Sequence, residues 1–196
     1  MVITGPGPIG LTLLQIVKLF SPRAVMVTGL RDDKLRLEKA QQLGADHVYY
    51  SEDDPVAEVQ RLTKGAGADV VFDCSGGEAA ITQATRMVRN GGWVTIIGLW
   101  GYDFNVNLDR IPYNNLTVRG SWGWDGMEYA DQAIRMAAGW YSWERALAIM
   151  AMGKIQLAPI VTRYIPLEDW REAFERLEAK QEIKVMMYPN AKYMPS

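Results

Sequence analysis

Short runs of apolar residues alternate along the first part of the chain with stretches in which apolar side chains recur at helical spacing. Runs of the first kind are typical of strands buried in a parallel sheet, and stretches of the second kind are typical of amphipathic helices. The apolar runs predict strands at residues 2–4, 24–28, 47–50, 69–73, 93–97 and 116–120. The helical stretches predict helices at residues 8–20, 32–43, 55–64 and 78–88.

This alternation stops after Ser121. Residues 127–138, 142–152 and 167–180 predict three helices, and residues 183–188 predict a late strand. Strands joined by helical crossovers form a doubly wound sheet, and six of them fit the order 3-2-1-4-5-6. We therefore predict an α/β fold with a doubly wound parallel six-stranded sheet at residues 1–121. A C-terminal helical extension is expected at residues 122–196.

The first predicted strand runs directly into Gly-Pro-Gly-Pro-Ile-Gly, which opens the first predicted helix. This is the G-x-G-x-x-G pattern in the strand–loop–helix context that dinucleotide binding requires. Gly5 permits the tight turn, Gly7 lets a pyrophosphate approach the backbone, and Gly10 allows close packing of helix and strand. The helix N-terminus attracts phosphate. The loop predicts a Rossmann-type site for NAD or NADP; FAD, or a glycine-rich turn without a ligand, is the alternative.

The end of the second predicted strand bears on the choice between NAD and NADP. An acidic residue about 20 positions after the loop usually binds the adenosine ribose of NAD, but Gly29 stands there. Arg31, Lys34 and Arg36 follow and could pair with a 2′-phosphate, which favours NADP. Asp32 and Asp33 could bind a ribose, which favours NAD, or simply suit a helix N-terminus. Of the two cofactors, NADP is favoured.

Composition excludes several classes of partner. A net charge of −2 with 48% hydrophobic residues is typical of a globular protein without a surface for nucleic acid. No apolar run is long enough to span a membrane. Cys74 is the only cysteine, which favours a reducing cytoplasmic location. With His47 as the only histidine, the chain has too few Cys and His ligands for a catalytic zinc site.

Several motifs occur together in a fixed order. They are GPGPIGL at 5–11, QLGADHV at 42–48, DVVFDCSG at 69–76 and RNGGWVTIIG at 89–98, followed by matching blocks at 148–157, 159–162, 165–178 and 183–185. In this order they resemble the medium-chain dehydrogenase/reductase superfamily, and within it the zinc-dependent alcohol, sorbitol and threonine dehydrogenases. Members of that family carry an N-terminal GroES-like catalytic domain with the zinc ligands, which this sequence lacks. The resemblance implies a C-terminal, cofactor-binding portion whose residues 122–196 pack on that domain in relatives.

The resemblance also implies a set of cofactor contacts. The pyrophosphate would lie on the loop formed by Gly5, Gly7, Pro8, Ile9 and Gly10. The adenosine ribose would lie near Gly29, Arg31 and Arg36, and the nicotinamide ribose near Cys74, Ser75 and Gly76. The nicotinamide would lie near Ile97, Gly98 and Leu99, with its carboxamide at Ser121 and Trp122. No catalytic or metal-ligating residue is assigned to this chain.

Two functions are compatible with these residues. The first is the NAD(P)-binding portion of a zinc-type alcohol or polyol dehydrogenase, inactive without the catalytic domain. The second is a stand-alone NAD(P)-binding module without catalysis. The resemblance further implies a homodimer through residues 116–120, because the outer edge of that strand has unpaired backbone groups. We also expect a fragment of a longer protein. Some of the apolar side chains of its C-terminal segment would then lose their burial partner, among Trp140, Trp143, Met150, Met152, Trp170 and Phe174.

Overall fold

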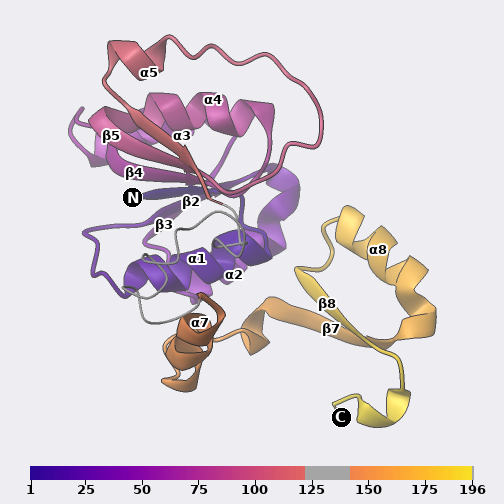
Figure 1. Cartoon of the computed structure of the whole chain (residues 1–196). Coiled ribbons are helices and arrows are strands. Elements are labelled where there is room, and N and C mark those ends of the chain that lie inside the picture. The colour runs from indigo at the N-terminus through magenta and orange to yellow at the C-terminus, as the bar shows by residue number, and fades with distance from the viewer. Residues whose placement is uncertain (122–141, 196) are drawn as a thin grey trace, which may run out of the picture.

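Six parallel strands form the centre of the molecule, in the order β3-β2-β1-β4-β5-β6 (Figure 1). The computed structural model describes residues 1–121 and 142–195. The strands are β1 (Val2–Thr4), β2 (Met26–Gly29), β3 (His47–Tyr50), β4 (Ala68–Asp73), β5 (Val88–Ile96) and β6 (Thr117–Gly120). The strand order is the predicted one, so the doubly wound six-stranded sheet is confirmed.

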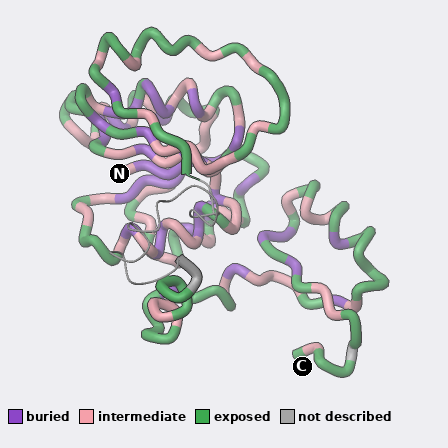
Figure 2. Tube along the Cα trace, in the orientation of Figure 1, coloured by how far each residue is buried: buried purple, intermediate pink, exposed green. Residues whose placement is uncertain are grey.

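Helices cover both faces of this sheet. On one face lie α1 (Pro8–Lys18) and α2 (Lys34–Gln42), the latter preceded by the 3-10 turn η1 (Arg31–Asp33). On the other lie α3 (Pro55–Leu62), α4 (Glu78–Met87) and the short, unpredicted α5 (Arg110–Tyr113). Alternate strand residues supply two apolar cores, with Ile3 in the first and Val2 in the second. The buried residues accordingly concentrate along the sheet (Figure 2).

The start of β5 differs from the prediction. The sequence predicts a helix to residue 88 and a strand from residue 93, but β5 begins at Val88 and includes Asn-Gly-Gly at 90–92. The pairing of β4 with β5 shifts register between Ala68 and Val70. Gly91 has φ +66° within this stretch, a conformation that glycine adopts at bulges without a steric penalty. Asn-Gly-Gly, which usually forms turns, therefore lies here within a strand whose pairing with β4 is irregular.

The C-terminal part contains a second, smaller unit. Its elements are α7 (Ser142–Ala151), η2 (Ala158–Ile160), β7 (Val161–Pro166), η3 (Leu167–Asp169), α8 (Trp170–Glu178), β8 (Lys184–Tyr188) and η4 (Ala191–Tyr193). Strands β7 and β8 pair in parallel, with α8 crossing between them (Figure 1). Helices α7 and α8 and strand β8 were predicted, whereas β7 was not. The helix predicted at 127–138 lies outside the described residues.

This C-terminal part packs on the large sheet at the face that α1 and α2 cover. Ile160 and Ile183 are buried in the same apolar core as Ile3. The Gln15 side chain on α1 donates to the Gln156 carbonyl (3.1 Å) and accepts from the Gln156 N–H (2.7 Å). The apolar core therefore continues across the domain boundary predicted at residue 121. That boundary stays a prediction.

Apolar side chains remain on the outside of the C-terminal part. Of the six side chains named from the sequence, Met152, Trp170 and Phe174 are exposed and Met150 is partly buried. Trp140 lies outside the described residues. Trp170 and Phe174 also form an edge-to-face aromatic pair on α8. Across the described ranges, no helix combines the length and the apolar character that crossing a membrane requires.

Candidate functional site

A groove runs across the carboxyl ends of β1, β2 and β4, where the strand order reverses. Its lining residues are Thr4, Gly5, Pro6, Gly7, Gly29, Leu30, Asp33, Arg36, Ser51, Cys74, Ser75, Gly77, Ala80 and Lys180. Ligands of open α/β sheets bind in the crevice at this switch point. The groove is therefore the place where the fold itself predicts a ligand.

The glycines of the first loop differ sharply in what surrounds them. A Cβ placed on Gly10 would lie 2.0 Å from the Gly5 carbonyl oxygen, and one on Gly5 would lie 2.8 Å from Ser75 Cα. A Cβ on Gly7 would meet nothing within 4 Å. Gly5 and Gly10 therefore let backbone segments approach each other, whereas Gly7 leaves open space. That space faces the groove, which Gly7 lines.

The start of α1 offers free donors beside this space. Gly7 is the N-cap residue, and no described side chain caps the helix. The first intrahelical bond runs from the Leu11 N–H to the Gly7 carbonyl (2.9 Å), so the N–H groups of Ile9 and Gly10 precede it and Pro8 has none. Uncapped N–H groups and the positive end of the helix dipole favour an anion there.

The structure explains the missing acidic residue at the end of β2. A Cβ on Gly29 would lie 2.7 Å from Pro6 Cγ. Because the glycine loop packs directly on this strand end, a larger residue at position 29 would displace Pro6. Gly29 is thus explained by packing, and the charged groups of the site come from elsewhere.

Those groups are Asp33, Arg36 and Lys180. The Asp33 carboxylate accepts from the Leu30 N–H (3.0 Å), from Arg36 Nη1 (3.2 Å) and from Lys180 Nζ (3.4 Å). Arg36 Nη2 also donates to the carbonyls of Glu182 (3.1 Å) and Leu177 (3.4 Å). The groove therefore ends in a cluster of one anion and two cations that joins η1 and α2 to the C-terminal part.

A buried carboxylate organises the middle of the groove. Asp73, at the end of β4, has no exposed surface. Its Oδ1 accepts from Thr4 Oγ1 (2.8 Å), from the Ser75 N–H (3.0 Å) and from Ser75 Oγ (2.7 Å). Its Oδ2 has no hydrogen-bond partner among the described residues. Asp73 thereby fixes the turn after β4 against the end of β1.

A second hollow lies beside the ends of β5 and β6. It is lined by Ile96, Ile97, Gly98, Leu99, Trp100, Gly120 and Ser121. A Cβ on Gly98 would lie 2.4 Å from the Gly76 nitrogen, so the turns after β4 and β5 touch through their backbones. The Ile97 and Gly98 N–H groups both donate to the Asp73 carbonyl. The predicted nicotinamide residues are thus gathered here, except Trp122, which lies outside the described residues.

Arg31, which was predicted to lie near the adenosine ribose, points to neighbouring side chains. Its guanidinium pairs with Asp53 and lies over the Tyr50 ring, 5.2 Å from the centroid. It does not line the groove, although the adjacent Leu30 does. Arg31 therefore stands at the rim of the groove, held by two neighbours.

Sequence reasoning missed several residues that line the groove, among them Thr4, Ser51 and Lys180. It also missed Asp73, which is buried beside the groove. The position of Asp73 at the end of a buried strand was a usable signal, because such strand ends meet at the switch point. Thr4 carried no distinguishing pattern. Lys180 is 147 positions from Asp33, so no local pattern connects them.

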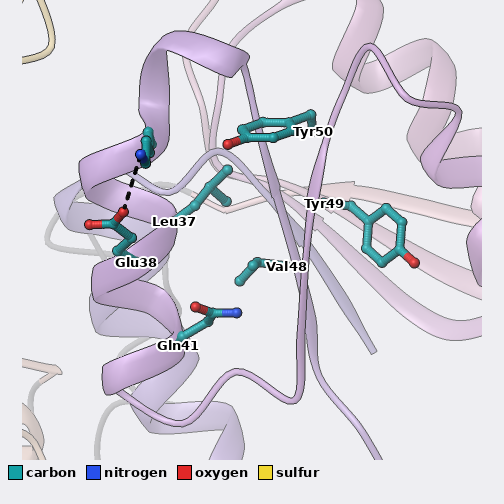
Figure 3. A pocket seen from close by; sticks show the side chains of 7 residues that line it. Leu37, Glu38, Gln41, Val48, Tyr49 and Tyr50 are labelled. Carbon is teal, nitrogen blue, oxygen red and sulfur yellow. Dashed lines mark ion pairs between the residues drawn. The ribbon is translucent and has the colours of Figure 1, made fainter.

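Another hollow lies between α2 and the edge strand β3 (Figure 3). It is lined by Lys34, Leu37, Glu38, Gln41, Val48, Tyr49 and Tyr50. Lys34 and Glu38 form an exposed ion pair across one turn of α2 (4.0 Å). Figure 3 shows Tyr50 directed toward α2 and Tyr49 directed away from it. This hollow has no glycine loop, so it fits a phosphate-bearing ligand less well than the groove.

The described residues hold no group of three or more His, Cys, Asp or Glu side chains able to bind a metal ion. The donor set therefore does not fit a zinc ion. The uncapped start of α1 and the cations Arg36 and Lys180 in the groove fit a dinucleotide.

Cys74 illustrates the low polarity at the end of β4. Burial, together with the nearby Asp73 charge, raises the pKa of the Cys74 thiol to about 12. Since the thiolate is the reactive form, we expect alkylation by iodoacetamide at pH 8 to be about 1,000-fold slower in the folded chain than in urea. Similar rates in the two states, measured by mass spectrometry, would contradict this environment.

The strand order and the glycine loop at the switch point define the class of Rossmann-like α/β proteins. Comparison with known proteins narrows this class. The sequence pattern of the zinc-binding dehydrogenase family matches residues 8–139. The chain belongs to that family.

Similar proteins include a sorbitol dehydrogenase from Halalkalibacterium halodurans, 32% identical over 96% of this chain and 51% of the relative. An L-threonine 3-dehydrogenase from Bacillus licheniformis is 31% identical over 95% of this chain and 50% of the relative. Among solved structures, an alcohol dehydrogenase from Thermus sp. ATN1 has a TM-score of 0.77 and 28% identity, over 95% of this chain and 51% of that one. The chain spans about half the length of the relatives that it matches.

Proposed function

We propose that this chain is the NAD(P)-binding portion of a zinc-type alcohol or polyol dehydrogenase. The observation that carries the proposal is the open space over Gly7 beside the uncapped start of α1. The similarity to sorbitol and threonine dehydrogenases supports the reaction class. In such a reaction the nicotinamide, when bound, would accept a hydride from the carbon that bears the hydroxyl group, or donate one to it in the reverse direction.

In this proposal the chain positions the dinucleotide. The N–H groups of Ile9 and Gly10 bind the pyrophosphate, while Gly7 allows it to approach. Residues Cys74, Ser75 and Gly76 border the nicotinamide ribose, and Ile97, Gly98, Leu99 and Ser121 border the nicotinamide. We place the zinc ion and the substrate outside the described residues, because no described cluster can hold the metal.

The experiment is a pair of measurements on the 196-residue chain. Fluorescence titration with NADPH and NADH should show saturable binding. Assays with a panel of polyols and added zinc should show no turnover by this chain. Zinc-dependent turnover would overturn the assignment of the chain as a cofactor-binding portion only, and absence of binding would overturn the assigned site.

We further propose a preference for NADP, carried by the cations near the end of β2. Arg31 is held by an exposed ion pair with Asp53, and such pairs are weak enough to be exchanged for a phosphate. Arg31→Ala should therefore weaken NADPH binding by about three- to tenfold more than NADH binding. Arg86→Ala, an exposed position on α4, is the charge-matched control. Equal losses for the two cofactors in titrations of Arg31→Ala would refute its role.

The homodimer remains a proposal that rests on the edge strand. Strand β6 is the last strand of the six-stranded sheet in the described residues, and an edge strand presents unpaired N–H and C=O groups. Pairing with β6 of a second copy would satisfy them. Multi-angle light scattering at micromolar concentration should give a dimer, and a monomer would count against the pairing.

A further inference from the structure

The adenosine end of the groove is closed by a side chain from the far end of the sequence. Lys180 lines the groove together with Asp33 and Arg36. The side chains of the three residues are 23%, 8% and 16% exposed, respectively. These side chains are thus largely shielded from water. Charge interactions are stronger in such a place than at an open surface. A change of charge at Lys180 would therefore alter the binding free energy of a charged ligand in this part of the groove.

The backbone at Lys180 supports a role for its side chain. Lys180 follows α8 and has φ +57°, with its N–H donating to the Leu177 carbonyl (3.1 Å). Left-handed positions after a helix usually carry glycine. A lysine there adopts a backbone conformation that glycine would adopt without strain. Helix termination alone therefore does not account for a lysine at this position.

The charges of the cluster do not balance. Asp33 contributes one negative charge, and Arg36 and Lys180 contribute one positive charge each, which leaves a net charge of +1. Arg36 Nε is in addition buried without a hydrogen-bond partner among the described residues. Without Lys180 the cluster would be neutral, and Asp33 would repel an incoming anion. Lys180 therefore decides whether this end of the groove attracts a negative group.

We propose that Lys180, with Arg36, binds the 2′-phosphate of NADP and is a specificity-determining residue of this site. This inference rests on the proposed NAD(P) function and extends it to the C-terminal part. The Lys180 ammonium exchanges its 3.4 Å contact with Asp33 for the doubly charged phosphate. Arg36 keeps its bonds to the Leu177 and Glu182 carbonyls, and so holds α8 and the start of β8 against α2. A cofactor without the 2′-phosphate makes no such contact.

The test uses two ligands that differ only in the phosphate concerned. Adenosine 2′,5′-bisphosphate and 5′-AMP are titrated into the 196-residue chain and into Lys180→Gly, Lys180→Arg and Lys154→Ala. Lys180→Gly removes the ammonium and also suits the left-handed backbone, so its Tm should be equal to or above that of the parent. Lys154 is an exposed lysine of the same part that does not line the groove, and controls for net charge.

We expect Lys180→Gly to weaken binding of the bisphosphate by about tenfold or more, with 5′-AMP changed by less than about twofold. Lys180→Arg should retain the preference, and Lys154→Ala should match the parent. The specificity role of Lys180 is overturned if Lys180→Gly alters both ligands equally or leaves the preference intact. Failure of the parent chain to bind either ligand would instead overturn the proposed function itself, and this inference with it.

Discussion

Gly7→Val should abolish detectable NADPH and NADH binding while leaving the chain folded. The Cβ of residue 7 points into open space at the groove, with no atom within 4 Å. Gly7 also has φ −72° and ψ 180°, a conformation that any residue adopts. A branched side chain would therefore fit the empty structure but occupy the volume assigned to the pyrophosphate. Loss of two charge-assisted contacts predicts at least about a 100-fold weaker affinity.

The measurement is fluorescence titration with each cofactor, paired with circular dichroism to follow the fold. Gly7→Ala is the graded control, since its smaller side chain should give an intermediate loss. Parent-like affinity in a folded Gly7→Val chain would show that the loop is not the binding site.

Gly10→Ala, unlike Gly7→Val, should cause a large loss of stability. The added methyl group would lie 2.0 Å from the Gly5 carbonyl oxygen and 3.2 Å from its carbon, so the loop or α1 must move. Overpacking of this kind costs about 3 kcal/mol, which lowers Tm by roughly 6–12 °C in a chain of this size. Thermal unfolding followed by circular dichroism measures the effect.

Gly7→Ala is the matched control for this variant, because the same methyl group is added three residues earlier in the same loop. Its Tm should fall by no more than about 2–4 °C, since alanine is a poorer N-cap than glycine by up to about 1 kcal/mol. If Gly10→Ala and Gly7→Ala unfolded at the same temperature, the close contact between Gly5 and Gly10 would not exist as described.

Hydrophobic patterning was sufficient to predict the large sheet. Strands such as β4 are buried between helices, so their apolar runs stand out from the helical spacing around them. Patterning failed for β5 at residues 90–92, where Asn-Gly-Gly has the composition of a turn but lies in an irregular strand. It also failed for β7, in which Ile165 alone is buried. A half-exposed strand of that kind gives too weak an alternation to be predicted.

The site was predictable where it depends on local backbone geometry. Gly5, Gly7 and Gly10 belong to one loop, and their spacing between a predicted strand and a predicted helix is enough to predict a dinucleotide site. Arg36 was predicted to lie near the adenosine ribose, but Lys180 was not, because it meets Asp33 and Arg36 only across the fold. Gly29 shows a further limit of sequence reasoning. A glycine where an acidic residue usually stands suggested NADP rather than NAD, but the close approach of Pro6 to Gly29 accounts for the glycine by packing alone. Gly29 is therefore no evidence about cofactor preference, which we propose is carried by the surrounding charges.

The most direct test of the central claim is a crystal structure of the 196-residue chain with NADPH bound. The account predicts the pyrophosphate within hydrogen-bond distance of the Ile9 and Gly10 N–H groups, over Gly7, and the 2′-phosphate between Arg36 and Lys180. The nicotinamide should lie beside Ile97, Gly98 and Leu99. A dinucleotide bound elsewhere, such as between α2 and β3, or one whose pyrophosphate does not touch the loop, would contradict it.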